Sequence, residues 1–166
     1  MIYWNDFVHD GITYPLGHLH PEIWEFKQAS KGDKPEIVYK ILIIYSLHCF
    51  TVKGGTKLPY SDNRETRNFC FKRYEDSKML PEIIKALGAG YVYHTGRQNF
   101  LRIDQGAAKE YEVFFTVTRT QNADLQIYIQ SAYLRTRGHS PVAGKIRFAV
   151  IAHNTQKGKK IKPPRR

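Results

Sequence analysis

The chain has 166 residues, and 42% of them are hydrophobic, which is typical of a folded protein and excludes a wholly disordered one. Lys and Arg number 26 against 15 Asp and Glu, which gives a formal net charge of +11. The longest apolar run, residues 41–45, is much shorter than the roughly 18–20 residues that cross a bilayer. Residues 1–7 lack the pattern of a secretory signal, and two cysteines, Cys49 and Cys70, are too few for a disulfide framework. We therefore expect one soluble, cytoplasmic domain without membrane association.

The excess of positive charge predicts a polyanionic partner. Basic surfaces concentrate polyanions, and nucleic acid is the commonest polyanion in the cytosol. The sequence shows no basic amphipathic helix with a wide apolar face, which disfavours a membrane surface as the partner. We expect a nucleic acid, with RNA favoured over DNA. The alternative is an acidic protein partner that neutralises the chain, and the sequence sets no oligomeric state.

The first half of the chain divides by its hydrophobic pattern. Residues 1–36 carry Gly and Pro among aromatic side chains and predict an irregular layer packed on the core. Period-two alternation then predicts a strand over 38–51, a polar loop over 57–67 and a second strand over 68–73. The main helix is expected over 80–87, before Gly88. Its apolar residues recur at helical spacing: Met79, Leu80, Ile83, Ile84 and Leu87.

The second half of the chain reads as strands joined by short connections. They are expected over 91–94 continuing to 99–103, then over 111–119, 125–135 and 145–153. Short connections favour antiparallel hairpins over parallel crossovers. We therefore predict an α+β fold, with a curved antiparallel sheet of five to six strands, one main helix and an irregular, aromatic-rich N-terminal layer. Residues 1–156 would form a single domain, in which 1–36 are the layer and 37–156 the sheet and helix.

The last ten residues, 157–166, carry six positive charges and no negative ones. Gly158, Pro163 and Pro164 disfavour regular structure there, so we expect a flexible basic tail. Such a tail either contacts nucleic acid or only aids solubility. Three of its lysines are candidate nucleic-acid-binding residues: Lys157, Lys159 and Lys160.

Familiar catalytic and cofactor motifs are absent from the sequence. The chain has no phosphate-binding glycine loop, no dinucleotide fingerprint, no Cys-x-x-Cys and no His-Glu-x-x-His. His18 and His20, with His48 and Cys49, would supply four metal ligands, but adjacent residues of a strand point to opposite faces. We therefore expect neither a metal site nor a cofactor.

Candidate catalytic residues come from one loop and two histidines. Arg64 and Arg67 are placed to hold phosphates, and Glu65 either acts as a base or pairs with them. His94 stands where the strand pattern breaks, near Arg97, and His48 stands late in the first long strand. A histidine is the natural acid or base near neutral pH, although His48 also fits a core or rim position.

A third cluster is expected where the strand over 125–135 leaves the core. Tyr133 and Arg135 share one face of this strand, and Arg147 and His153 share a face of the next. Tyr133 is suited to stack on a base, while Arg97, Arg135 and Arg147 are suited to hold phosphates. The structural alternative is that the tyrosine and arginines only line the edge of a sheet.

The order of the predicted elements, an irregular N-terminal part followed by a sheet whose late strands carry Arg, Tyr and His, resembles that of small RelE-like and barnase-like ribonucleases, including bacterial toxins. The resemblance is one of architecture and transfers no site residue, and a helix midway along the sheet departs from it. We predict an RNA-directed protein, in its sharpest form a metal-independent endoribonuclease of the toxin type. Cleavage of that kind needs a base for the 2′-hydroxyl, a cation for the phosphorane and an acid for the leaving oxygen. The alternatives are a non-catalytic nucleic-acid-binding or accessory protein of a mobile element, and a small module that binds an acidic protein.

Overall fold

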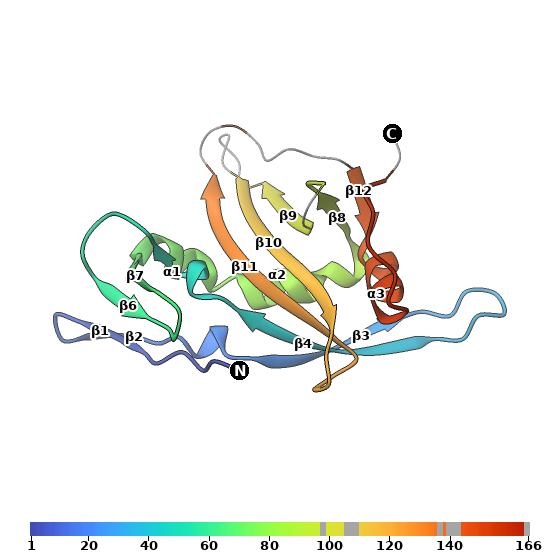
Figure 1. Cartoon of the computed structure of the whole chain (residues 1–166), viewed down its shortest axis with the longest axis horizontal. Helices are drawn as coiled ribbons and strands as arrows, with labels where there is room; N and C mark the ends of the chain where they lie inside the picture. The colour runs from blue at the N-terminus through green and yellow to red at the C-terminus, as the bar shows by residue number, and fades with distance from the viewer. Residues whose placement is uncertain (97–98, 105–109, 136–137, 139–143, 165–166) are drawn as a thin grey trace.

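The computed structural model describes residues 1–96, 99–104, 110–135, 138 and 144–164. The largest element in this part is a seven-stranded sheet with the strand order β12-β8-β9-β10-β11-β4-β3 (Figure 1). Its strands are β3 (Glu22–Gln28), β4 (Ile37–Tyr45), β8 (Tyr91–His94), β9 (Asn99–Asp104), β10 (Glu110–Arg119), β11 (Leu125–Arg135) and β12 (Gly144–Arg147). The predicted α+β class is therefore confirmed.

The prediction of a single, wholly antiparallel sheet of five to six strands is wrong. β11 pairs with β4 in parallel, with Ile127 opposite Ile43, and the other neighbouring strands of the large sheet run antiparallel. Two strands far apart in sequence thus lie side by side within the sheet, next to its edge strand β3. Parallel neighbours require a long connection, which short-hairpin reasoning did not anticipate.

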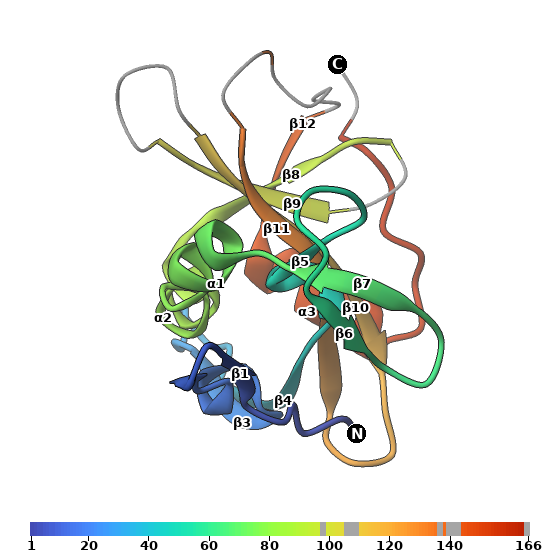
Figure 2. The same ribbon diagram turned by 90° about the vertical axis from the view of Figure 1, so that its left-hand side faces the viewer.

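Two small sheets flank the large one in the described residues. β1 (Phe7–His9) and β2 (Ile12–Tyr14) form a hairpin, and β5 (Thr51–Val52), β6 (Pro59–Ser61) and β7 (Thr66–Phe69) form a three-stranded sheet. Figure 2 shows β5, β6 and β7 together at the near end of the molecule. The N-terminal layer, predicted to be irregular, thus contains a hairpin and also supplies β3, an edge strand of the large sheet.

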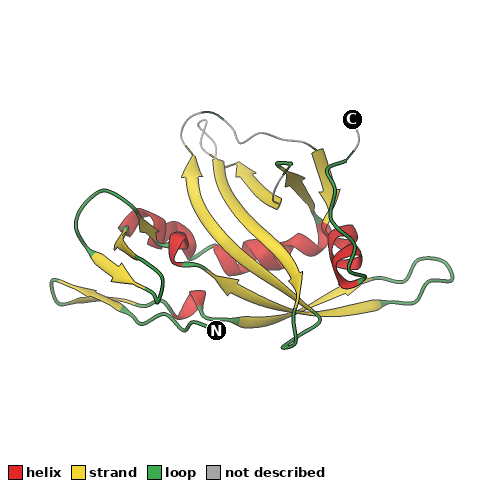
Figure 3. Ribbon diagram, viewed as in Figure 1, coloured by secondary structure: helices red, strands yellow, loops and turns green. Residues whose placement is uncertain are grey.

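Three α-helices, not one, appear in the part of the chain that the structure describes (Figure 3). They are α1 (Phe71–Ser77), α2 (Leu80–Lys85) and α3 (Phe148–Gln156), and short 3₁₀ turns occur at η1 (Gly17–Leu19), η2 (Leu47–Cys49) and η3 (Ala86–Ala89). The predicted strands over 68–73 and 145–153 therefore each end in a helix. In α3 the reason is visible in the sequence, because Phe148, Ile151 and Ala152 are buried at the i, i+3, i+4 spacing of a helix.

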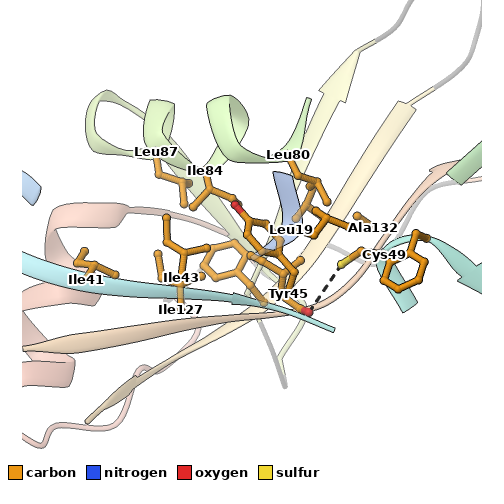
Figure 4. Close-up of a cluster of buried hydrophobic side chains, with 14 of the residues drawn as sticks. Leu19, Ile41, Ile43, Tyr45, Cys49, Leu80, Ile84, Leu87, Ile127 and Ala132 are labelled. Carbon is orange, nitrogen blue, oxygen red and sulfur yellow. Dashed lines mark hydrogen bonds between the residues drawn. The ribbon is translucent and has the colours of Figure 1, made fainter. Parts of the chain in front are cut away.

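The core lies between the large sheet and α2. Leu80, Ile84 and Leu87 project from α2 and η3 toward Ile43 and Ile127 of the sheet (Figure 4). All five side chains are essentially inaccessible to solvent. Burial of this apolar surface is the main force that fixes the sheet against the helix. No helix in the described ranges is long and apolar enough to cross a membrane.

The end of β4 sets up the region discussed below. The strand predicted over 38–51 stops at Tyr45, and Ser46 turns the chain into η2. The Ser46 hydroxyl accepts a hydrogen bond from the backbone N–H of His48 (3.1 Å) and donates one to the carbonyl oxygen of Gln130 (2.6 Å). These side-chain hydrogen bonds end the strand, because they replace the backbone hydrogen bonds that would continue the sheet.

Candidate functional site

The loop between β6 and β7 folds against η2 and brings Glu65 to His48. The Nε2 atom of His48 lies 2.5 Å from Oε1 of Glu65, although the two residues are 17 positions apart. Both side chains remain accessible, with 37% of His48 and 43% of Glu65 exposed. Two of the predicted catalytic residues therefore form one hydrogen-bonded pair that faces solvent.

A tight turn holds Glu65 in place. The Oδ1 atom of Asp62 accepts hydrogen bonds from the backbone N–H groups of Arg64 (2.8 Å) and Glu65 (2.9 Å). Below the turn, the hydroxyls of Ser61 and Thr66 lie 2.7 Å apart across the paired strands β6 and β7. An aspartate that binds backbone two and three residues ahead stabilises a turn. What reads in the sequence as a polar loop is the tip of an ordered hairpin.

Arg73 of α1 fixes the position of His48. One guanidinium nitrogen, Nη1, donates to the carbonyl oxygens of His48 and Thr51, both at 3.0 Å. The Thr51 hydroxyl donates to the carbonyl of Leu47 (2.6 Å), which closes η2 from within. Arg73 was not among the predicted site residues, and its segment, predicted as a strand over 68–73, is helical at Arg73. It is a positioning residue here.

The two arginines of the loop have different surroundings. The side chain of Arg67 is 11% exposed, its Nε donates to the hydroxyl of Thr51 (3.0 Å), and its Nη1 lies 3.7 Å from Oε2 of Glu65. Arg64 is exposed, and within the described residues its guanidinium pairs with no carboxylate. Arg67 therefore supports Glu65, whereas Arg64 is placed to meet an incoming anion.

Two adjoining cavities open beside this pair. The first, about 320 Å³, lies next to His48 and Glu65, and the second, about 410 Å³, extends over the outer face of β11. They share four lining residues: Ser46, Asp62, Arg64 and Tyr128. A ligand with two chemically different parts would therefore span both cavities across Arg64.

Electrostatics favour an ionised carboxylate at Glu65. The hydrogen bond from His48 lowers the pKa of Glu65, and the charges of His48 and Arg67 act in the same direction. Burial raises the pKa of Tyr128, so its hydroxyl stays protonated near neutral pH. An ionised Glu65 can only accept this hydrogen bond, so Nε2 of His48 is its donor, and the other ring nitrogen of His48 is Nδ1. No described residue makes a hydrogen bond with that Nδ1.

A family model that matches residues 6–156 describes the YjaZ family. The chain belongs to the YjaZ family. It is similar to Protein YjaZ of Escherichia coli (strain K12), with 28% identity over 179 aligned positions that cover 97% of this chain and 95% of that protein. No solved structure matches the chain.

In this YjaZ-family chain, the predicted Tyr133–Arg135 cluster is largely engaged in the protein's own contacts. Arg135 donates from Nε to Glu112 and from Nη2 to the Tyr133 hydroxyl, each at 2.8 Å. The guanidinium groups of Arg73 and Arg135 lie 5.2 and 5.5 Å from the centre of the Tyr133 ring. Through Arg73, this cluster adjoins the His48 site.

Arg147 does not lie beside Tyr133, contrary to the prediction. β12 pairs with β8 at the far edge of the sheet, and three strands separate it from β11. Arg147 instead lies 5.6 Å over the ring of Tyr91, while Lys145 lies 5.4 Å over that of Tyr93. His153, expected on the same strand, is on α3. The structure thus has a second surface of basic and aromatic residues.

His94 occupies a different environment from His48. It is 4% exposed, its Nδ1 accepts a hydrogen bond from the backbone N–H of Gly96 (2.8 Å), and burial lowers its pKa. In the described structure no contact joins it to His48 or Glu65. Arg97, its predicted neighbour, lies outside the described residues.

The segment after α3 runs beside β12 (Figure 1). Ile161 is partly buried against the core, and Pro164 lines a cavity with Arg147. The flexibility predicted for this tail, and its contact with nucleic acid, stay predictions. Its predicted contact residues are all exposed: Lys157, Lys159 and Lys160.

The residues weighed as metal ligands have other partners. His18 is 2.8 Å from the Ser77 hydroxyl, and His20 is 3.0 Å from the carbonyl oxygen of Trp4. Over the described ranges, no three His, Cys, Asp or Glu side chains gather closely enough to hold a metal ion.

Proposed function

We propose that this YjaZ-family chain binds RNA and cleaves its backbone without a metal ion in the cleft beside His48 and Glu65. The observation that carries the proposal is the 2.5 Å contact between these two side chains at the mouth of a polar cavity that Arg64 also lines. A paired histidine and carboxylate beside a cation supply two of the functions that metal-independent phosphodiester transfer needs, a general base and a positive charge for the phosphorane.

In the proposed reaction, Nδ1 of His48 accepts the proton of a ribose 2′-hydroxyl. The 2′-oxygen then attacks the adjacent phosphorus, and the bond from phosphorus to the 5′-oxygen of the next nucleotide breaks. The products are a 2′,3′-cyclic phosphate and a 5′-hydroxyl, which takes its proton from water, and the hydroxide that remains takes the proton back from the imidazolium of His48. Glu65 stabilises the imidazolium that forms, as a carboxylate does for a general-base histidine.

Arg64 would stabilise the negative charge that builds up on the phosphoryl oxygens. It suits this role because it lines both cavities and is not committed to a carboxylate within the described structure. Arg67 and Arg73 would not contact the substrate. Arg67 positions Glu65, and Arg73 positions the backbone of His48. A charge-assisted contact to phosphate is stronger than a neutral one.

RNA is the favoured substrate for two reasons. The chain carries a net charge of +11, which attracts polyanions, and the proposed chemistry uses a 2′-hydroxyl that DNA lacks. A second candidate function is RNA binding without cleavage. It is favoured by the Tyr91–Arg147 and Tyr93–Lys145 pairs on β8 and β12, which are suited to bind a nucleic-acid strand away from His48.

The test is incubation of the purified chain with end-labelled total RNA in EDTA. We expect discrete fragments that end in 2′,3′-cyclic phosphate. His48→Ala should abolish cleavage and leave RNA binding in a gel shift within about twofold, since all 26 Lys and Arg residues remain. His153→Ala, which alters an exposed histidine on α3, is the matched control and should cleave normally. Intact RNA with the wild-type chain would overturn the proposal, and a retained gel shift would then favour the binding function.

A further inference from the structure

We propose that the 410 Å³ cavity over the outer face of β11 is a nucleobase pocket, and that Tyr128 is the ring on which the base stacks. The inference deepens the proposed function, since it names the part of the RNA that is recognised next to the cleavage site. The cavity combines an aromatic and aliphatic wall with a polar rim. It is lined by Met1, Ile2, Trp4, Ile44, Tyr45, Ser46, Asp62, Arg64, Thr116, Thr118, Gln126 and Tyr128.

The alternation of β11 presents Tyr128 to this cavity. Leu125, Ile127 and Ile129 are fully buried on the inner face, so Gln126 and Tyr128 point to the opposite side. Tyr128 is half-buried, which leaves part of its ring accessible to a ligand. Tyr128 thus lies between Gln126 and Gln130 on the polar face of an interior strand. On this face its ring can contact a ligand and is not needed to fill the core.

The neighbouring strands leave room beside the ring. Tyr128 lies opposite Thr116 of β10 and opposite Ile44 of β4, and both of these side chains line the same cavity. Thr116 is small, so the sheet surface beside the tyrosine is flat on that side. An aromatic side chain on an open sheet surface is a common platform for a base, because every base has a π-face.

The position of Arg64 joins this pocket to the proposed cleavage site. Arg64 and Tyr128 line both cavities, while His48 and Glu65 line the smaller one alone. A nucleotide with its base on Tyr128 would thus have its phosphate directed toward Arg64 and His48. This arrangement matches a ligand with one flat apolar part and one anionic part, which describes a ribonucleotide.

Asp62 gives the pocket a hydrogen-bonding edge. Its Oδ1 is occupied by two backbone N–H groups of the turn, whereas its Oδ2 makes no hydrogen bond with a described residue. Gln126, whose side chain ends in an amide, lines the same cavity. These groups suit the amino and carbonyl edge of a nucleobase, and they offer little to a bare phosphate.

Fluorescence of Trp4 provides a direct assay, because Trp4 lines the cavity and the sequence has one other tryptophan, Trp24. In a Trp24→Phe background, adenosine 3′-monophosphate should change the emission and bind more tightly than ribose 5-phosphate or inorganic phosphate. Stacking of a base is worth roughly 1–3 kcal/mol, so Tyr128→Ala should weaken this binding by about 10-fold. Tyr128→Phe keeps the ring and should bind within about twofold of the parent.

The outcomes separate the pocket from the chemistry. Equal affinity for adenosine 3′-monophosphate and ribose 5-phosphate, or an unchanged affinity in Tyr128→Ala, would overturn the nucleobase pocket even if RNA is cleaved. Tight, Tyr128-dependent binding without cleavage would support the pocket and overturn the proposed reaction. Thr116→Phe, which fills the space beside the ring, serves as a second variant if Tyr128→Ala does not fold. It should also weaken binding, and full affinity in a folded Thr116→Phe would count against the pocket.

Discussion

Glu112 and Arg135 form a 2.8 Å ion pair between the neighbouring strands β10 and β11, and its two partners differ sharply in exposure. The Glu112 side chain is fully buried, whereas 28% of the Arg135 side chain is exposed. Glu112 also makes a further contact within the protein. The hydrogen bond to Glu112 raises the pKa of Arg135, so its guanidinium stays charged at neutral pH. A buried carboxylate of this kind depends on its cation, because an unpaired charge in the core is costly.

Arg135→Ala should therefore destabilise the fold, not only weaken a surface contact. Loss of one partner of a buried pair costs about 3–5 kcal/mol, and because Arg135 is partly exposed we expect a loss of about 2–3 kcal/mol. Urea unfolding followed by circular dichroism measures it. Arg147→Ala, which removes an exposed arginine, should change stability by no more than about 0.5 kcal/mol. Equal stability of the two variants would mean that Arg135 serves only at the surface.

The contact between His48 and Glu65 predicts a change in the pKa of Glu65 that NMR can follow. Removing the hydrogen bond in His48→Ala should let the pKa of Glu65 rise toward its ordinary value, because that bond is the largest cause of its lowered pKa. Since the folded-state pKa is lowered, the stabilisation from this pair is present above the ordinary carboxyl pKa and is lost as pH falls through the lowered one. Carbon-13 titration of the glutamate carboxyl groups would show the change. The same titration in His153→Ala should leave Glu65 unmoved, and a shift there would point to a general charge effect.

Local hydrophobic patterns predicted strands and helices well where one face of the strand or helix is buried. The strand predicted over 125–135 is β11, because Leu125, Ile127 and Ile129 alternate with polar neighbours. The helical spacing of Leu80 and Ile84 likewise marked α2. The parallel pairing of β4 with β11 left no local signal, since it depends on contacts between segments more than 80 residues apart.

The candidate site was predicted in its residue types but not in its geometry. His48, Arg64, Glu65 and Arg67 were all candidates, yet the contact between His48 and Glu65 depends on a hairpin that reads as a loop. Tyr128 was overlooked although the alternation that buries Ile127 and Ile129 places it on the outer face. That signal was in the sequence, whereas the position of Arg73 depended on a helix that starts inside a strand-like run.

Gly88 marks a close approach between η3 and β3. A Cβ at this position would lie 3.1 Å from two ring carbons of Phe26, and the ring is 4% exposed and so has little room to move. Gly88→Ala should cost about 1 kcal/mol or more, because overpacking of a core forces side chains from their preferred positions. Gly17→Ala, where a Cβ would meet nothing within 4 Å, is the matched control. Thermal unfolding of the two variants should separate them, and equal melting temperatures would show that Phe26 moves freely.

The surface formed by Tyr91, Tyr93, Lys145 and Arg147 makes a prediction about salt dependence. Lys145 and Arg147 lie over the two tyrosine rings on neighbouring strands, which places two cations within reach of the phosphates of a strand that follows the aromatic rings. Each phosphate neutralised on single-stranded nucleic acid contributes about 0.7 to the slope of log K against log salt. The double variant Lys145→Ala/Arg147→Ala should therefore reduce the magnitude of the slope of log K against log salt for RNA binding by about 1.4.

The control for this experiment must remove the same charge elsewhere. Lys72 on α1 and Lys78 directly after it are suitable, because each is already paired with a carboxylate, at 2.6 Å with Asp76 and 2.9 Å with Glu75. If RNA follows the β8–β12 surface, Lys72→Ala/Lys78→Ala should leave the slope nearly unchanged. Equal losses in the two double variants would show that net charge alone governs binding. A specific loss in Lys145→Ala/Arg147→Ala, with cleavage of short oligonucleotides retained, would place strand binding on this surface and the chemistry at His48.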